Sequence, residues 1–349
     1  MKSLINKLYT DMFLTKDEWI KLFANQENVD FDYLFSLARK RSYEIYGNKI
    51  FIRGLIEFTN YCKNDCYYCG IRRDNSKVSR YRLTTGEILE CCKYSYDAGF
   101  RTFVLQGGED PYFTDTRMID LIQKIRRDYN DCAITLSIGE RSHDSYEAMY
   151  AAGADRFLLR HETALCEHYS KLHPPELTSD NRKRCLYDLK SIGFQTGTGF
   201  MVGSPYQTSE NLAEDMMFIK ELGPHMVGIG PFISHNETPF KDKPSGTLSQ
   251  TLYVLALLRL MIPKLLIPST TALGTLDKDG RLLGIRAGAN VIMQNVTPKD
   301  SRINYTLYEN KDRAGDIDNS DTNPLFIALK DENYKFDISR GDSKVTGGK

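Results

Sequence analysis

Between residues 50 and 295, short apolar runs alternate with longer amphipathic segments, and no other feature restricts the possible folds of the chain more strongly. A short apolar run suits a buried strand, and an amphipathic segment suits a helix that covers one face of a sheet. Repeated strand–helix units of this kind build a parallel sheet. Eight runs predict eight strands, at residues 50–58, 102–105, 133–137, 157–160, 195–202, 226–230, 265–268 and 289–293. The predicted fold class is therefore α/β, and the 349 residues suit one (β/α)8 TIM-type barrel with short extensions.

The segments on either side of the barrel differ from it in pattern. Residues 1–48 predict helices laid outside the barrel, because apolar residues such as Trp19 and Phe23 recur at helical spacing. The barrel itself is assigned to residues 49–308. Residues 309–349 are assigned to a C-terminal extension. The composition turns polar from about Glu309, and residues 310–323 are nearly free of large apolar residues, so this part is interpreted as a mobile connection or tail.

Helix starts can be placed from capping signals. Thr84 and Glu87 have the spacing of a capping box, which predicts a helix that ends near Gly99. Thr208 is predicted to begin another helix, which runs to about Leu222. Both helices lie where the alternating pattern requires a crossover between strands.

The charge balance argues against two classes of partner. The 46 basic and 46 acidic residues give a formal net charge of +0, without the basic field that holds phosphate backbones or anionic membranes. The longest apolar stretch, residues 252–258, is too short to span a bilayer, and the first residues lack the pattern of a secretory signal. We therefore expect no nucleic-acid or membrane partner and a cytoplasmic location.

The cysteines are distributed as in a metal site rather than in a disulfide framework. Cys62, Cys66 and Cys69 fall within eight residues, whereas the other five are adjacent or scattered. Their C-x3-C-x2-C spacing follows the first strand, on the barrel face where active sites lie. A [4Fe-4S] cluster normally takes four thiolates, so three leave one iron open to a small molecule. In radical SAM enzymes, which carry such a loop, S-adenosylmethionine (SAM) binds that iron, and its reductive cleavage gives the 5′-deoxyadenosyl radical.

A structural zinc site is the alternative for these cysteines. It requires four protein ligands, and no histidine or fourth cysteine lies at zinc-finger spacing. Tyr68 favours the cluster, because an aromatic residue before the last cysteine belongs to the radical SAM pattern and can lie beside the adenine. The second strand ends in Gly107-Gly108-Glu109, which resembles the radical SAM GGE motif, whose glycines let the backbone approach the methionine moiety.

Further candidate ligands end the later strands. A charged run, Arg160-His161-Glu162, is costly at the end of a buried strand unless it is paired, so an internal ion pair and a ligand role both stay open. The glycines around residues 197–199 and 228–230 do not form the G-x-G-x-x-G pattern of a dinucleotide site. Other candidates at the same face are Ser137, Met201, Ile229, Thr270, Thr271, Met293 and Tyr305.

Several sequence strings together resemble the HydE family of radical SAM maturases, which help to assemble the organometallic site of iron-only (FeFe) hydrogenase. The resemblance covers roughly residues 40–310. The strings are Cys69-Gly70-Ile71-Arg72-Arg73-Asp74-Asn75 and residues 105–111, 159–164, 226–233 and 288–293. Methylornithine synthase and biotin synthase are more distant in pattern, because they share the cluster loop and barrel but lack the Arg-His-Glu-Thr and Ile-Gly-Pro-Phe strings.

The resemblance implies roles for these residues. SAM would be bound by Tyr68, Gly107, Gly108, Glu109, Ser137, Glu162, Arg182, Met201 and Ile229. The substrate cavity would be lined by Gln106, Arg160, Thr270, Thr271, Met293 and Tyr305, where Arg160 and the threonines can bind an anion. The implied substrate is a cysteine-ligated Fe(CO)2CN species supplied by a sister maturase, under anaerobic conditions. A ferredoxin or flavodoxin is the expected reductant.

One departure from the family changes the expected cofactor content. Some members carry a second cluster on three cysteines near the C-terminus, whereas this chain has no cysteine after Cys185, so one cluster is expected. Two other functions stay open. One is a radical SAM mutase or synthase of the methylornithine synthase or biotin synthase type. The other is a non-enzymatic iron–sulfur scaffold or carrier that hands over a metal fragment.

Overall fold

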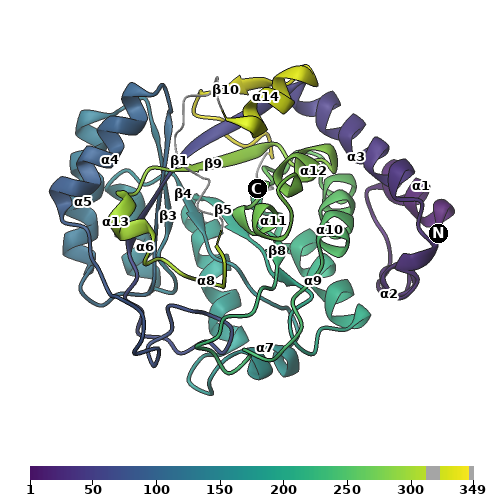
Figure 1. Ribbon diagram of the computed structural model, residues 1–349, viewed down its shortest axis with the longest axis horizontal. Coiled ribbons are helices and arrows are strands. Elements are labelled where there is room, and N and C mark those ends of the chain that lie inside the picture. The colour runs from purple at the N-terminus through teal and green to yellow at the C-terminus, as the bar shows by residue number, and fades with distance from the viewer. Residues whose placement is uncertain (312–322, 346–349) are drawn as a thin grey trace.

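The computed structural model describes residues 1–311 and 323–345, and a parallel sheet surrounded by helices forms its centre (Figure 1). The strands of this sheet are β1 (Lys49–Thr59), β2 (Thr102–Gly107), β3 (Ala133–Ser137), β4 (Arg156–Leu158), β5 (Gln195–Thr198), β7 (Met226–Val227), β9 (Val291–Asn295) and β10 (Lys335–Asp337). They pair in the order β10-β1-β2-β3-β4-β5-β7, and β9 pairs with β1. The sheet therefore curls around β1, which has partners on both edges.

Two isolated bridges continue the ring from β7 to β9. Met226 bridges to Leu266, and Pro268 bridges to Val291. The predicted (β/α)8 barrel is confirmed, with the predicted strand at 265–268 present as two bridges rather than as a regular strand. All the pairings around the ring are parallel, so the carboxyl ends of the strands meet at one face.

Two predicted strands are each divided in the structure. The segment 195–202 forms β5 and then β6 (Met201–Val202), and the segment 226–230 forms β7 and then β8 (Gly230–Pro231). β6 and β8 pair in a separate two-stranded sheet. The break falls at Gly199, where a Cβ atom would lie 1.9 Å from the carbonyl oxygen of Gly228. Only glycine allows the two backbones to come this close, so the chain bends there instead of continuing as one strand.

Helices connect the strands as the alternating pattern predicts. They are α4 (Thr85–Asp97), α5 (Asp115–Asp128), α6 (His143–Ala151), α7 (Cys166–Leu172), α8 (Ser179–Ile192), α9 (Ser209–Leu222), α10 (Leu248–Met261), α11 (Thr271–Leu276), α12 (Gly280–Arg286) and α13 (Lys299–Arg302). The capping box of Thr84 and Glu87 is confirmed, because each side chain accepts a hydrogen bond from the other's backbone N–H. Thr208 likewise begins α9, which ends at Leu222.

The N-terminal helices pack on the outside of the barrel. They are α1 (Lys2–Asp11), α2 (Lys16–Ala24), a 3-10 turn η1 (Gln26–Asn28) and α3 (Phe31–Tyr46). α2 lies against α9, while α1 and α3 lie against α10. Trp19 stacks on Phe23 with ring centroids 5.7 Å apart, and Tyr253 of α10 donates a hydrogen bond to the carbonyl of Leu22. Within the described residues, no helix has both the length and the apolar character required to cross a membrane.

The described C-terminal residues contain regular structure that the polar composition did not predict. α14 (Pro324–Asp331) and β10 lie beside β1 and α3, drawn in yellow next to the purple N-terminal segments (Figure 1). The residues that follow β10 in the chain cross the end of the barrel opposite the cavity. Buried Arg156 of β4 donates to the carbonyl of Arg340 at 2.6 Å and pairs with Asp342 at 2.7 Å. Most of the predicted mobile segment, at residues 312–322, lies outside the described residues.

Asp342→Asn should destabilise the fold at neutral pH. Burial opposes ionisation of Asp342, but hydrogen bonds from Arg340 and Arg156 outweigh it and hold its pKa well below the ordinary value. Removing this carboxylate leaves the guanidinium of Arg156 buried without a counter-charge. Because the Asp342 side chain is 43% exposed, we expect a loss of about 1–2 kcal/mol, less than for a fully buried pair. Chemical denaturation at pH 7 measures the loss.

The loss should also depend on pH in one direction. A carboxyl with a lowered pKa stabilises the fold above its unfolded-state pKa of about 3.9, and this contribution fades as the pH falls further. The difference between wild type and variant should therefore be full at pH 7 and shrink below about pH 4. Asp242→Asn, in an exposed loop, is the matched control and should change nothing. A difference that stays constant down to about pH 3 would contradict the ion-pair account.

Candidate active site

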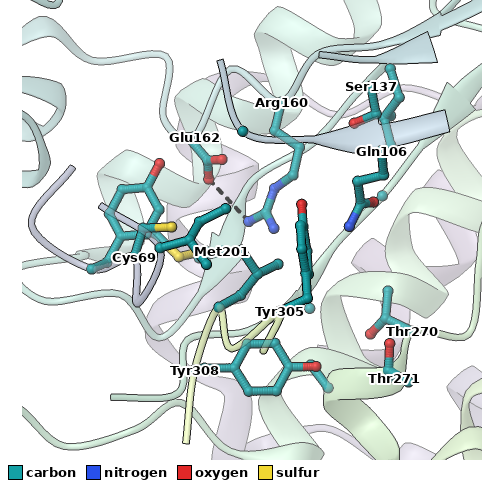
Figure 2. Close-up of a pocket in the computed structure, with 18 of the residues that line it drawn as sticks. Cys69, Gln106, Ser137, Arg160, Glu162, Met201, Thr270, Thr271, Tyr305 and Tyr308 are labelled. Atoms are coloured by element: carbon teal, nitrogen blue, oxygen red, sulfur yellow. Dashed lines mark ion pairs between the residues drawn. The ribbon is translucent and has the colours of Figure 1, made fainter. Parts of the chain in front are cut away.

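One cavity of about 350 Å³ opens among the carboxyl ends of the barrel strands. Its size is in the range of small-molecule sites. Figure 2 shows Cys69 at one side of this cavity, Thr270 and Thr271 at the other, and Arg160 between them. Every site residue predicted from the sequence lines it, namely Cys62, Cys66, Tyr68, Cys69, Gln106, Gly107, Gly108, Glu109, Ser137, Arg160, Glu162, Arg182, Met201, Ile229, Thr270, Thr271, Met293 and Tyr305.

The loop that carries Cys62, Cys66 and Cys69, here called the cysteine loop, is fixed by backbone and arginine contacts rather than by regular structure. Lys63 N–H donates to the carbonyl of Glu109 at 2.9 Å, and Gly70 N–H donates to the carbonyl of Leu307 at 2.8 Å. The guanidinium of Arg80 donates to several carbonyls of the same loop, including that of Ile71 at 2.8 Å. A loop without a hydrophobic core of its own is thereby held in one shape, with its cysteines facing the cavity.

The three thiols of the cysteine loop are neutral in the metal-free protein. Burial raises the pKa of Cys62, Cys66 and Cys69, that of Cys69 to about 12, so the metal-free groups are neutral thiols. Among the described residues, no three metal-binding side chains converge closely enough for one ion. A cubane [4Fe-4S] cluster does not require the three thiolates to reach one ion, because each thiolate binds a separate iron. Ligation would displace the thiol protons, since iron binds the thiolate.

Glycines let the backbone of the second strand end approach the cysteine loop. A Cβ atom on Gly108 would lie 2.2 Å from the carbonyl oxygen of Tyr61 and 2.8 Å from Cβ of Cys62. The carboxylate of Glu109 fills the space beside Gly139 and accepts a hydrogen bond from Glu140 N–H at 3.0 Å. The Gly-Gly-Glu segment therefore places backbone groups at the cavity wall next to the cysteine loop.

Arg160 and Glu162 face each other across the cavity wall. Arg160 Nη2 lies 3.0 Å from Glu162 Oε2, without the alignment of a hydrogen bond, so both buried atoms retain unused bonding capacity (Figure 2). Glu162 has a φ of +64°, a strained backbone for a residue other than glycine. Between them, His161 points away from the cavity to Thr198 at 2.9 Å and to Asp215 at 3.3 Å. This buried anchor holds the two charged side chains toward the cavity.

A second arginine at the cavity is neutralised by its surroundings. Arg182 Nε lies 2.7 Å from Glu140 Oε1; Arg182 is buried, and the Glu140 side chain is 10% exposed. Tyr68 is hydrogen bonded to His173 at 3.1 Å, and His173 stacks on Tyr169 with centroids 3.9 Å apart. Burial lowers the pKa of His173 to about 3, so its ring is neutral. The Tyr68 ring is therefore held by a neutral aromatic cluster beside the cysteine loop.

The far side of the cavity carries a buried hydroxyl, that of Thr270, which has no hydrogen-bond partner in the protein. Its Oγ1 atom lies 3.2 Å from where a Cβ atom on Gly230 would lie. Tyr305 is also buried there, and burial raises the pKa of its hydroxyl well above the ordinary value. A buried hydroxyl without a hydrogen bond costs free energy, so Thr270 is suited to bind a ligand.

The structure adds residues that the sequence analysis missed. Glu57 lines the cavity and pairs with Lys311, and Asn295 donates to the other carboxylate oxygen at 2.9 Å. Glu140 and Tyr308 also line or adjoin the site. An acidic residue near the end of a buried strand was a visible signal for Glu57. No local signal could identify Lys311, because it reaches the site from beyond the predicted barrel.

Comparisons with known proteins agree with the geometry. The radical SAM superfamily model matches residues 56–219, which include the three cysteines. The [FeFe] hydrogenase maturase subunit HydE of Thermotoga maritima is 45% identical over 278 residues, covering 80% of this chain and 79% of that protein. The chain belongs to the HydE family.

Other relatives of this HydE-family chain are more distant. The 3-methylornithine synthase of Methanosarcina barkeri is 31% identical over 86% of this chain and 85% of its own. The crystal structure of methylornithine synthase has a TM-score of 0.83 at 28% identity, covering 96% of this chain and 97% of that one. The hydrogenase maturase HydG, at 21% identity and a TM-score of 0.80, covers 96% of this chain and 75% of its own, and shows the fold alone.

Membership in the radical SAM superfamily implies a [4Fe-4S] cluster and SAM as cofactors. The residues present fit both groups. Three thiols on one pinned loop supply three of the four cluster ligands, and the glycines at 107 and 108 leave room beside them for a small molecule. The unused capacity of Glu162 adds an acceptor in the same cavity.

Cys66→Ser should abolish cluster assembly and SAM cleavage while leaving the barrel folded. Serine is a far less acidic and harder ligand than cysteine, so it binds iron poorly. The strands, by contrast, are buried in apolar clusters that do not involve the cysteine loop. Anaerobic iron analysis should show loss of the cluster. Far-ultraviolet circular dichroism and the thermal midpoint should match those of cluster-free wild type.

Cys166→Ser is the matched control, because Cys166 is exposed at the start of α7 and belongs to no predicted ligand set. It should keep a full cluster and normal SAM cleavage. A Cys66→Ser protein that retained both would show that the three-cysteine assignment is wrong. An unfolded cluster-free wild type would instead show that the barrel depends on the cluster.

Proposed function

We propose that this chain is a maturation enzyme of FeFe hydrogenase that uses SAM to act on a cysteine-ligated Fe(CO)2CN species from a sister maturase. The relationship to the Thermotoga maritima HydE protein supports this role. The observation that carries it is one cavity with the three thiols at one side and, beyond them, buried atoms of Arg160 and Thr270 that make no hydrogen bond to the protein. A radical source and an anion-binding site thus share one space.

The proposal assigns the cofactor side of the cavity as follows. Cys62, Cys66 and Cys69 hold a single [4Fe-4S] cluster, which supplies the electron for reductive cleavage of SAM to the 5′-deoxyadenosyl radical. Glu162 accepts hydrogen bonds from SAM. Arg182 neutralises the nearby Glu140 carboxylate. The other residues assigned to SAM are Tyr68, Gly107, Gly108, Glu109, Ser137, Met201 and Ile229.

The proposal assigns the opposite side to the substrate. The guanidinium of Arg160 binds the negative charge of the complex, and its planar donors can contact two acceptor atoms at once. Thr270 donates from a hydroxyl that has no protein partner. The remaining substrate residues are Gln106, Thr271, Met293 and Tyr305. Buried Tyr305 and the apolar part of this wall exclude water from the reacting groups.

The partners follow from the same assignment. Sister maturases would supply the substrate and receive the product, and a small electron-transfer protein such as a ferredoxin or flavodoxin would be the reductant.

A methylornithine-type mutase is the second candidate function, favoured by the relationship to methylornithine synthase in both sequence and structure. A non-enzymatic iron–sulfur carrier is the third.

One experiment separates these three functions. Anaerobically reconstituted protein is mixed with dithionite and SAM, alone, with lysine, or with the cysteine-ligated Fe(CO)2CN complex. The proposed function requires release of 5′-deoxyadenosine and methionine, and consumption of the iron complex but not of lysine. Lysine turnover would assign the chain to the mutase type. Absence of 5′-deoxyadenosine under all conditions would leave only the carrier function.

Reconstituted protein should hold about four irons per chain. The remaining five cysteines do not form a second local set, because Cys91, Cys92, Cys132 and Cys185 are buried elsewhere in the fold and Cys166 is exposed on α7. Iron and sulfide analysis with Mössbauer spectroscopy measures the content. Near eight irons, with one of these cysteines as a ligand, would contradict the single-cluster proposal.

Arg160→Ala should weaken use of the iron complex by one to two orders of magnitude more than it slows uncoupled SAM cleavage, because a lost charge-assisted contact costs roughly 1.5–3 kcal/mol. The guanidinium is proposed to pair with the anionic substrate and not with the sulfonium of SAM. Rates of complex consumption and of 5′-deoxyadenosine release are measured in parallel. Arg127→Ala, which removes an exposed side chain of α5, is the control. Equal loss of both rates would instead identify Arg160 as a structural partner of Glu162.

A further inference from the structure

An exposed tyrosine next to the cysteine loop is flanked by two lysines. Tyr206 is 52% exposed, although large aromatic side chains are usually covered. The ammonium group of Lys243 lies 4.7 Å from its ring centroid, and that of Lys171 lies 5.8 Å from it. Both contacts are in the range of cation–π interactions. Two positive charges therefore converge on one apolar surface group.

The loop that carries Tyr206 is fixed rather than free. Tyr206 has a φ of +68°, in the left-handed region. The carbonyl of the preceding Pro205 is hydrogen bonded to buried His168 of α7 at 2.9 Å. Gln207 accepts from Gly203 N–H at 2.7 Å and donates to the carbonyl of Met201 at 2.9 Å. A strained backbone held from both sides presents the ring outward in one position.

Neither of the two lysines is held in a salt bridge by the described residues. Within the described part of the chain, no salt bridge joins Lys171 or Lys243 to an acidic residue. Other lysines near the cluster loop are paired, as in Lys63 with Glu109 at 3.3 Å. Like charges that converge without a counter-charge favour an acidic partner, even on a chain with no net charge.

Aromatic contacts lead from this surface to the cysteine loop. The ring of Tyr206 lies 6.2 Å from that of Phe240, and Phe240 lies 6.1 Å from Tyr67. Tyr67 stands between Cys66 and Tyr68 in the sequence, and Phe240 is buried. The exposed ring is thus two aromatic contacts from a residue that adjoins a cluster ligand.

The geometry points to a docking site for a small acidic electron-transfer protein, formed by Tyr206, Lys171 and Lys243. The inference rests on the proposed function, because it requires a cluster at the three cysteines. In the docked complex one electron passes from donor to cluster. The donor is oxidised by one electron, the cluster is reduced by one, and no atom or proton is transferred. The docked donor thus supplies the electron that each SAM cleavage consumes.

The size and chemistry of the surface suit a transient complex. Electron-transfer pairs bury small interfaces and separate after each transfer. Tyrosine is enriched among interface hot spots, and charges at the rim of an interface mainly raise the rate of encounter. We therefore expect binding that is weak, fast and sensitive to salt.

The first test measures binding without turnover. Oxidised acidic flavodoxin is titrated into oxidised, cluster-loaded protein by calorimetry at low ionic strength. The double variant Lys171→Glu/Lys243→Glu should raise the Kd at least tenfold, and Tyr206→Ser should raise it without changing its salt dependence. The control is Lys2→Glu/Lys40→Glu. These lysines also lie over tyrosine rings, those of Tyr33 and Tyr9, on the outer N-terminal helices.

The second test separates docking from chemistry. SAM cleavage is driven either by limiting reduced flavodoxin or by dithionite, a small reductant that needs no docking site. The lysine double variant should lose at least tenfold in the flavodoxin-driven rate and nothing in the dithionite-driven rate. The control variant should match wild type in both. High salt should bring wild type down toward the double variant.

Each outcome bears on a different claim. Unchanged Kd and flavodoxin-driven rates in the double variant would overturn the docking site while leaving the proposed function intact. Equal losses with flavodoxin and dithionite would also overturn it, since the lysines would then act on the site itself. If wild type cleaved no SAM even with dithionite, the proposed function would fail, and the docking inference with it.

Discussion

The pairing of β1 on both edges is the constraint on which the rest of the site depends. All but the first of its eleven residues are buried, between β2 on one side and β9 on the other. A strand with two paired edges cannot slip, because a shift by one residue would turn every inward side chain outward. The cysteine loop begins directly after this strand, so its place at the barrel mouth follows from the pairing of β1.

The charges of the cavity divide it into two environments. Arg182 is matched by a carboxylate 2.7 Å away and offers little to a further anion. Arg160 is only loosely paired with Glu162, and both retain unused atoms toward the cavity. The two arginines thus differ in what they can bind. This difference supports the separation of a cofactor side from a substrate side.

The sequence predicted what depends on local pattern. Strand runs, capping residues and cysteine spacing are visible within a few residues, and each predicted strand takes its place in the ring. The division of two strands was missed because it comes from contact between Gly199 and Gly228, on neighbouring strands. The cavity could be assembled from strand ends because parallel barrels bring them together. The ligand roles of those residues stay predictions, since lining a cavity does not identify what binds there.

The C-terminal region shows why polar composition alone does not identify a solvated tail. Lys311 enters the cavity to pair with Glu57, whereas Asp342 crosses the opposite end of the barrel to pair with Arg156. Both partners are charged residues buried within the barrel, and such groups require counter-charges. A segment that supplies them must itself be polar, so its composition resembles that of a solvated tail. Polar composition indicates a solvated tail only where every buried charge of the preceding domain has a counter-charge within that domain. Here Glu57 of β1 and Arg156 of β4 find theirs in the C-terminal residues.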